Sequence, residues 1–161
     1  MSRVPVQKPG RSEQVVCTPV LFLEAVKKRL RIKDFVWDLA ASHENKVCDS
    51  CYTEEDDALI QPWNRVQGWN WCNPPFSGLE DWTSKASKES FKGAQTVMLV
   101  PASVGSNWWR EWAEPYAYQT FLNGRVTFVG HTSPYPKDLA LLLYTPWRFT
   151  GSEIWQWRGT L

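Results

Sequence analysis

The clearest helical pattern in the chain occupies residues 20–30 (VLFLEAVKKRL). Its apolar residues recur every four positions along one face, at Phe22, Val26 and Leu30. Cations gather toward the end of this segment, where the helix dipole favours positive charge. Thr18 stands where a capping side chain is expected and Pro19 at the first helical position, so we predict that a helix begins here.

Further along, the pattern alternates between buried strands and amphipathic segments. A second helix is expected over residues 79–93, with Gly93 at its C-terminal cap position, and a third, capped by Ser106, over residues 106–117. A turn and a short helix are expected over residues 53–63. The first predicted strand lies in DFVWDLAAS (34–42) and ends at Asp38, where a turn of small residues begins. The others are a weak strand over 47–52, GWNWC (68–72), QTVMLVP (95–101), LALLLYTP (139–146) and EIWQW (153–157).

This order of elements predicts an α/β domain with a mostly parallel sheet. The Asn-Gly pair inside FLNGRVTFVG (121–130) predicts an antiparallel hairpin near the C-terminus. We expect residues 15–161 to form one domain, preceded by a flexible basic arm over residues 1–14. Asp38 and Asn73 each follow a predicted strand. Both should therefore lie at the carboxyl edge of the sheet, where such sheets bind ligands.

Composition narrows the classes of function. The net charge is only +1, so contact with nucleic acid would depend on local clusters of cations, such as Arg3, Lys8 and Arg11 in the arm. No apolar run approaches the roughly 20 residues of a membrane span, and a secretory h-region is missing at the N-terminus. We therefore expect a cytosolic protein, without membrane partners. Eleven tryptophans are the outlier in composition, and several stand in polar stretches where a ring would be accessible for stacking.

Four cysteines are present and are expected to be reduced. Cys48 and Cys51 have the spacing of metal ligands, which Cys17, Cys72 or His43 could complete. A second CxxC pair is missing, however, and buried thiols that act as small apolar side chains explain the same residues. Both interpretations stay open.

The segment WCNPPFSG (71–78) places a carboxamide before two prolines and an aromatic ring. The exocyclic amine of adenine is a poor nucleophile, so an enzyme that alkylates it must hold its two hydrogens while the nitrogen becomes tetrahedral. The side-chain oxygen of Asn73 and the backbone carbonyl of Pro74 would be two such acceptors. Pro74 and Pro75 fix the backbone angles and so aim these acceptors in advance. The ring of Phe76 would stack on a base removed from the double helix. An ordinary turn is the alternative explanation.

Six segments in this order resemble a known family, the phage-encoded, Dam-like DNA adenine-N6 methyltransferases. They are TPVLFLEAV, FVWDLAASHENKVC, YTEEDDAL, WCNPPFSGLEDWTSKA, VMLVPASVGSNWW and GRVTF. The resemblance extends over about residues 17–146. It implies a compact Rossmann-like methyltransferase fold, S-adenosylmethionine as cofactor, double-stranded DNA as partner and a location in the cytoplasm of the host cell. No metal is needed for such a reaction.

The resemblance also implies roles for particular residues. The catalytic tetrapeptide corresponds to Asn73, Pro74, Pro75 and Phe76. The cofactor-binding positions correspond to Thr18, Pro19, Asp38, Ala40, Asp57 and Asn73. Ala40 and Ala41 stand where glycines are frequent in this loop of the family. Asp57 would accept from the adenine amine of the cofactor, but it also belongs to an acidic run, residues 54–57, that solvent alone would explain.

Recognition of DNA must come from loops, because 35 positions between Asp38 and Asn73 leave no room for a separate recognition domain. The candidates are the arm, the segments GSNWWREW (105–112) and GHTSPYPKD (130–138), and the residues Trp108, Arg110 and Arg125. Helix packing would equally explain the tryptophans, and hairpin contacts would explain Arg125. His43 and His131 have no partner motif.

We expect a monomer or a weak homodimer. The rival functions are a protein glutamine methyltransferase and a non-catalytic module that binds nucleic acid.

Overall fold

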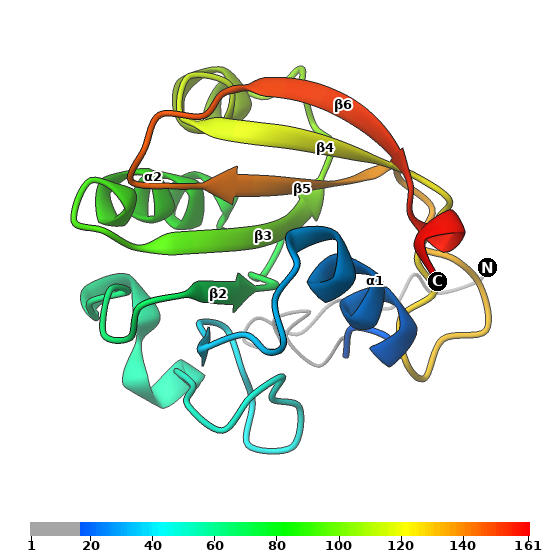
Figure 1. Cartoon of the computed structure of the whole chain (residues 1–161), viewed down its shortest axis with the longest axis horizontal. Coiled ribbons are helices and arrows are strands. Elements are labelled where there is room, and N and C mark those ends of the chain that lie inside the picture. The colour runs from blue at the N-terminus through cyan, green and yellow to red at the C-terminus, as the bar shows by residue number, and fades with distance from the viewer. Residues whose placement is uncertain (1–16) are drawn as a thin grey trace, which may run out of the picture.

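A six-stranded sheet lies at the centre of the protein, whose computed structural model describes residues 17–161. The basic arm, with Arg3, Lys8 and Arg11, lies outside the described residues. The strand order is β1-β2-β3-β5-β4-β6, and Figure 1 shows β2, β3, β5, β4 and β6 following one another across the sheet. Their bounds are Trp37–Asp38 (β1), Trp69–Cys72 (β2), Gln95–Pro101 (β3), Ala117–Asn123 (β4), Leu139–Tyr144 (β5) and Gly151–Gln156 (β6).

The sheet is mixed, with parallel pairings in the majority. β1 pairs with β2, β2 with β3, and β4 with β6 in parallel, whereas β5 runs antiparallel to both of its neighbours, β3 and β4. The predicted α/β class and the mostly parallel sheet are therefore confirmed.

The predicted Asn-Gly hairpin is wrong in its position. β4 ends at Asn123, and Gly124, with φ of 103°, leads into a connection of residues 124–138 before β5 begins. Val126 and Phe128 turn into the core instead of pairing back on β4. β4 and β5 are antiparallel neighbours, but a long loop joins them. β6 then pairs with β4 and not with β5, so EIWQW does not form a hairpin with the preceding strand.

Two helices cover opposite faces of the sheet, because strand residues alternate between the faces. Helix α1 (Val20–Leu30) buries Phe22 and Val26 against one face, and helix α2 (Leu79–Ser90) buries Trp82 and Ala86 against the other. The strand residues under α1 are Trp71, Val97, Leu99 and Leu141, and those in the core beneath α2 are Cys72, Met98, Val100 and Leu142.

Helix α1 begins one residue later than expected, and its cap differs. Pro19 is the N-cap residue and no side chain caps the helix. Thr18 is not a cap because its hydroxyl is hydrogen-bonded to a residue of the Asn-Pro-Pro-Phe turn instead. The prediction of a Thr18 cap is therefore wrong, and the reason is a tertiary contact.

The remaining segments are short. Residues 47–52 form only an isolated bridge between Cys51 and Asp38 rather than a strand. The expected turn and short helix become two 3₁₀ turns, η2 (Glu54–Asp56) and η3 (Ala58–Ile60). The third helix is reduced to a π-helical turn, η4 (Trp109–Ala113), which ends before Pro115, and a last 3₁₀ turn, η5, covers Trp157–Thr160. Within residues 17–161, none of the helices is long and apolar enough to cross a bilayer.

Candidate active site

The ends of the parallel strands bring the two predicted polar positions to one edge of the sheet. Asp38 ends β1, and Asn73 follows the last residue of β2. The register pairs Asp38 with Trp71, and the backbone N–H of Leu39 donates to the carbonyl of Trp71 at 2.9 Å. Asp38 and Asn73 therefore lie beside one another at the carboxyl edge, as the sequence predicts.

Asp38 is a buried carboxylate with only 3% of its surface exposed. Its Oδ2 accepts from the backbone N–H of Val47 at 2.9 Å and its Oδ1 from that of Ala40 at 3.2 Å. Burial raises the pKa of Asp38 to about 6, while these two hydrogen bonds act in the opposite direction. At neutral pH the group is ionised, and it would bind a cation readily because the surrounding protein solvates it poorly.

A small cavity of about 220 Å³ lies against this carboxylate. It is bounded by the start of α1, by the loop after β1 and by the residue that follows β2. Four of the predicted cofactor-binding residues line it, namely Thr18, Asp38, Ala40 and Asn73. The structure thus brings together residues that are widely separated in the sequence.

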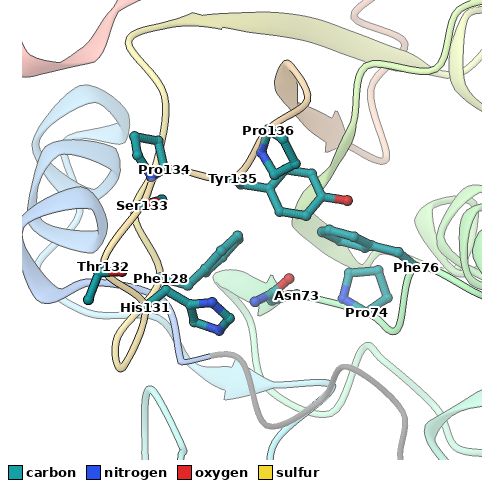
Figure 2. A pocket seen from close by; sticks show the side chains of 10 residues that line it. All are labelled: Asn73, Pro74, Phe76, Phe128, His131, Thr132, Ser133, Pro134, Tyr135 and Pro136. Carbon is teal, nitrogen blue, oxygen red and sulfur yellow. The ribbon is translucent and has the colours of Figure 1, made fainter. Parts of the chain in front are cut away.

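Asn73 is tied to the start of α1. Its Nδ2 donates to the hydroxyl of Thr18 at 3.2 Å, across 55 positions of sequence. This bond fixes the plane of the amide, because nitrogen and oxygen occupy opposite branches of the side chain. Figure 2 shows the oxygen of Asn73 directed toward the space beside Tyr135 and Phe76. The carboxamide therefore presents an acceptor on the side away from Thr18.

The turn itself connects a strand to a helix. After Asn73, the backbone N–H of Gly78 donates to the carbonyl of Pro75 at 3.3 Å, and α2 starts at the next residue. Pro74 is buried, and Phe76 is half-buried. Because the prolines restrict φ and the turn is anchored at both ends, the positions of the Asn73 side chain and the Pro74 carbonyl are well defined.

A larger cavity, of about 560 Å³, lies on the other side of Asn73. Figure 2 shows that the Asn-Pro-Pro-Phe turn forms one wall and the loop of residues 128–136 the other. Its aromatic rings meet edge to face: Tyr135 lies 5.6 Å from Phe76 and 5.8 Å from Phe128, between ring centroids. Asn73 lines both cavities and so stands between an acidic site and an aromatic one.

The loop that closes the larger cavity is held by backbone contacts. The N–H of Val129 donates to the carbonyl of Cys17 at 3.0 Å, and the N–H of Tyr135 donates to the carbonyl of Val126 at 2.8 Å. Phe128 is buried in the core under α1. These contacts attach residues 124–138 to the segment that also holds Asn73, so the two walls are positioned by the same few residues.

Sequence reasoning singled out the segments GRVTF and GHTSPYPKD but not Phe128 or Tyr135 within them. Both are aromatic residues in a Pro- and Gly-rich stretch, and this combination was the feature of the sequence that could have indicated them as site residues. His131, which has no partner motif in the sequence, is exposed but lines the cavity.

Other predicted site residues lie elsewhere. Pro19 caps α1 and does not line either cavity. Asp57 is exposed, in the left-handed region at φ of 51°, and lines neither cavity. Trp108 packs on Trp109, with 5.4 Å between ring centroids. The exposed Arg110 pairs with its neighbour Glu111 at 3.1 Å.

The CxxC pair was the other candidate site. Cys48 and Cys51 are half-buried free thiols, and burial raises the pKa of Cys48 to about 12. Among residues 17–161, no three His, Cys, Asp or Glu side chains are grouped so that they could hold a metal ion.

Two cavities and several polar residues lie at the carboxyl edge of the parallel strands. This arrangement is typical of the α/β proteins that bind a ligand at that edge. A family model described as DNA N-6-adenine-methyltransferase (Dam) matches residues 8–140, most of the chain, and the protein belongs to this family. A DNA N-6-adenine-methyltransferase of Escherichia phage T1 is 36% identical over 74 residues, which cover 46% of this chain. The match spans only 31% of the length of that relative.

Proposed function

We propose that the protein transfers a methyl group from S-adenosylmethionine to the exocyclic amine of adenine in double-stranded DNA. Its membership of the family supports this activity. The observation that carries it is the position of Asn73, which lines both the acidic cavity and the aromatic cavity. Methyl transfer needs the methyl donor and the accepting nitrogen to meet in line, and Asn73 borders both of the cavities that would hold them.

The smaller cavity fits the methionine portion of the cofactor. The Asp38 carboxylate would pair with the ammonium, and the Thr18 hydroxyl and the backbone near Ala40 would border it. At about 220 Å³ the cavity is smaller than the roughly 300–1,000 Å³ of typical ligand pockets. It would therefore hold this portion and not the whole cofactor. When bound, S-adenosylmethionine supplies a methyl group on a positively charged sulfur, which an aligned nitrogen displaces in line.

The larger cavity would receive the adenine. Asn73 Oδ1 and the carbonyl of Pro74 would each accept one hydrogen of the exocyclic amine, which favours the tetrahedral nitrogen that attacks. Asn73 carries no charge and does not act as a base, so the proton leaves after the methyl has transferred. The bond from Asn73 to Thr18 would keep the amide aligned between turnovers, and Thr18 is on this account a positioning residue.

A base in this cavity must leave the double helix, because the side chains that would hold it line a hollow of the protein and cannot reach around a base that is still stacked in the duplex. Phe76, Phe128 and Tyr135 line the cavity and offer aromatic surface, and stacking on such rings is worth about 1–3 kcal/mol per base. Their edge-to-face arrangement supports a slot in which one ring could face the base and another could contact its edge.

We further propose that the domain is of the compact Rossmann-like methyltransferase type. The unit β2-α2-β3 is a parallel crossover, and β1 extends the same parallel sheet. Its carboxyl edge carries both cavities, which is where open α/β sheets bind cofactors.

Methyl transfer from labelled S-adenosylmethionine to duplex DNA tests the proposal, followed by sequencing of the treated DNA for N6-methyladenine. The variant Asn73→Ala should lose about 10²–10³ in rate, because it removes one positioned acceptor. Its binding of the cofactor should change by no more than a few-fold. Asn64→Ala is a matched control, since Asn64 is exposed and its side chain donates only to the carbonyl of Lys92 in the described structure.

Two results would refute the proposal. Label found in a glutamine-containing peptide and not in DNA would assign the same turn to protein methylation. A protein that binds DNA but shows no heat of binding with S-adenosylmethionine in calorimetry would be a binding module without this activity. Turnover by Asn73→Ala above a third of the wild-type rate would refute the catalytic role of the carboxamide.

A further inference from the structure

Besides the acidic and the aromatic cavity, a more open depression of about 300 Å³ adjoins the aromatic one. Three segments line it: the end of β3 with Ser103, the residue Arg125 after β4, and residues 136–138 before β5. Pro136 lines both this depression and the aromatic cavity, so the two are neighbours. A hydroxyl and two cations, from Ser103, Arg125 and Lys137, give the depression the donors that bind phosphate.

Arg125 is positioned before any ligand arrives. Its Nη1 donates to the carbonyl of Pro136 at 2.9 Å, and its own carbonyl accepts from Nη2 of Arg158 at 2.9 Å. A third cation thus lies beside the depression. The guanidinium has five N–H donors in a planar fork that matches phosphate oxygens. Because the Pro136 bond holds the fork, less side-chain entropy is lost on binding than for a fully mobile arginine.

Asp138 lies on the same rim and opposes this charge. Its carboxylate is 3.9 Å from Nη2 of Arg125, and both side chains are more than half exposed. An exposed pair at this distance contributes little to stability. A phosphate of the DNA would displace the carboxylate from Arg125 and would also be repelled by it.

We propose that this depression binds a backbone phosphate of the DNA strand that carries the target adenine. The inference rests on the proposed function, which makes DNA the ligand. A base and its own phosphate are joined through one sugar, so a site for the phosphate must lie beside the site for the base. The shared residue Pro136 provides this adjacency. The depression would position the strand and would not read its sequence.

Binding of a fluorescent DNA duplex, measured against salt concentration, tests the inference. Arg125→Ala and Lys137→Gln should each make the slope of log affinity against log salt shallower by about 0.9, because each removes one phosphate contact. When the salt concentration rises from 50 to 200 mM, the factor by which the affinity falls should therefore be about 3.5 times smaller for each variant than for the wild type. A purely structural role of Arg125 would weaken binding without changing this slope.

Matched controls lie at the opposite end of the sheet. Lys92 precedes β3, and Arg148 follows β5, whose last residue Tyr144 pairs with Thr96 at the start of β3. Lys92→Gln and Arg148→Ala should leave the slope unchanged. Asp138→Asn should bind DNA more tightly than the wild type, an effect of opposite sign that loss of a structural contact would not produce. It keeps the backbone bond from Ala102 to the carbonyl of residue 138.

Unchanged slopes in both Arg125→Ala and Lys137→Gln, or weaker binding by Asp138→Asn, would overturn the inference. These measurements require no methyl transfer. If wild-type protein methylates adenine while the slopes stay unchanged, only the phosphate site is refuted. If it binds DNA with the expected slopes but methylates nothing, the proposed function fails and the depression stands.

Discussion

The buried carboxylate of Asp38 makes a quantitative prediction about stability against pH. Its pKa is about 6 in the folded protein against an ordinary value of 3.8, so the folded state binds this proton more tightly than the unfolded chain does. The contribution of Asp38 to the free energy of unfolding is therefore fully present below about pH 4. It is lost as the pH rises toward and through 6. A shift of about two units corresponds to about 3 kcal/mol, at 1.36 kcal/mol per unit.

Urea unfolding between pH 4 and 7.5 measures this term when the wild type is compared with Asp38→Asn. The asparagine has a similar shape but does not titrate, and its amide loses one of the two backbone bonds at every pH. The constant loss cancels when the difference between the two proteins is followed with pH. Relative to the variant, the wild type should lose about 2 kcal/mol from pH 4 to pH 7, which is most of the full term, because at pH 4 much of the unfolded chain has already released this proton.

The same group should make cofactor affinity depend on pH with the opposite sign. An ammonium ion pairs only with the ionised carboxylate, and at pH 5 a group with a pKa of about 6 is ionised in about one molecule in eleven. Affinity for S-adenosylmethionine should therefore be about tenfold lower at pH 5 than at pH 7, and Asp38→Asn should be weak and independent of pH in this range. A stability difference that stays flat from pH 4 to 7 would refute the buried-acid argument. A flat affinity profile would refute the contact with the ammonium.

Substitutions at three other positions have expected outcomes. If the ring of Phe76 stacks on adenine, Phe76→Tyr should keep substantial turnover and Phe76→Leu should lose about 5- to 150-fold. If Phe76 only fills space, the order of the two variants should be reversed, both in turnover and in melting temperature. Thr18→Val should lower the rate of methyl transfer while urea stability stays within about 1 kcal/mol, because it releases Asn73 from its 3.2 Å bond; an unchanged rate would contradict the positioning role. Lys85→Met should cost about 3 kcal/mol in urea unfolding, because it leaves the buried Glu89 without its 2.6 Å partner, and a cost below 1 kcal/mol would contradict this.

The sequence by itself determined the local elements and the edge of the sheet where the site lies. Helix α1 follows from apolar residues at a spacing of four, and β3 follows from a continuous apolar run whose bounds match the prediction. The Asn-Pro-Pro turn could not continue a strand, because proline lacks the N–H that the ladder needs. Asp38 and Asn73 both follow parallel strands, so their meeting at one edge was determined once the strands were recognised.

Only the tertiary structure decided which distant segments complete the site. An Asn-Gly pair favours a tight hairpin locally, but burial of Val126 and Phe128 and the bond from Val129 to Cys17 carry residues 124–138 across to the Asn-Pro-Pro-Phe turn instead. Likewise, Thr18 before Pro-Val is a good helix cap by local criteria, yet its hydroxyl accepts a hydrogen bond from Asn73 instead. Such contacts join residues 55 or more positions apart. These contacts form only when the packed core brings the partners together, so they cannot be predicted from the spacing of residues along the chain.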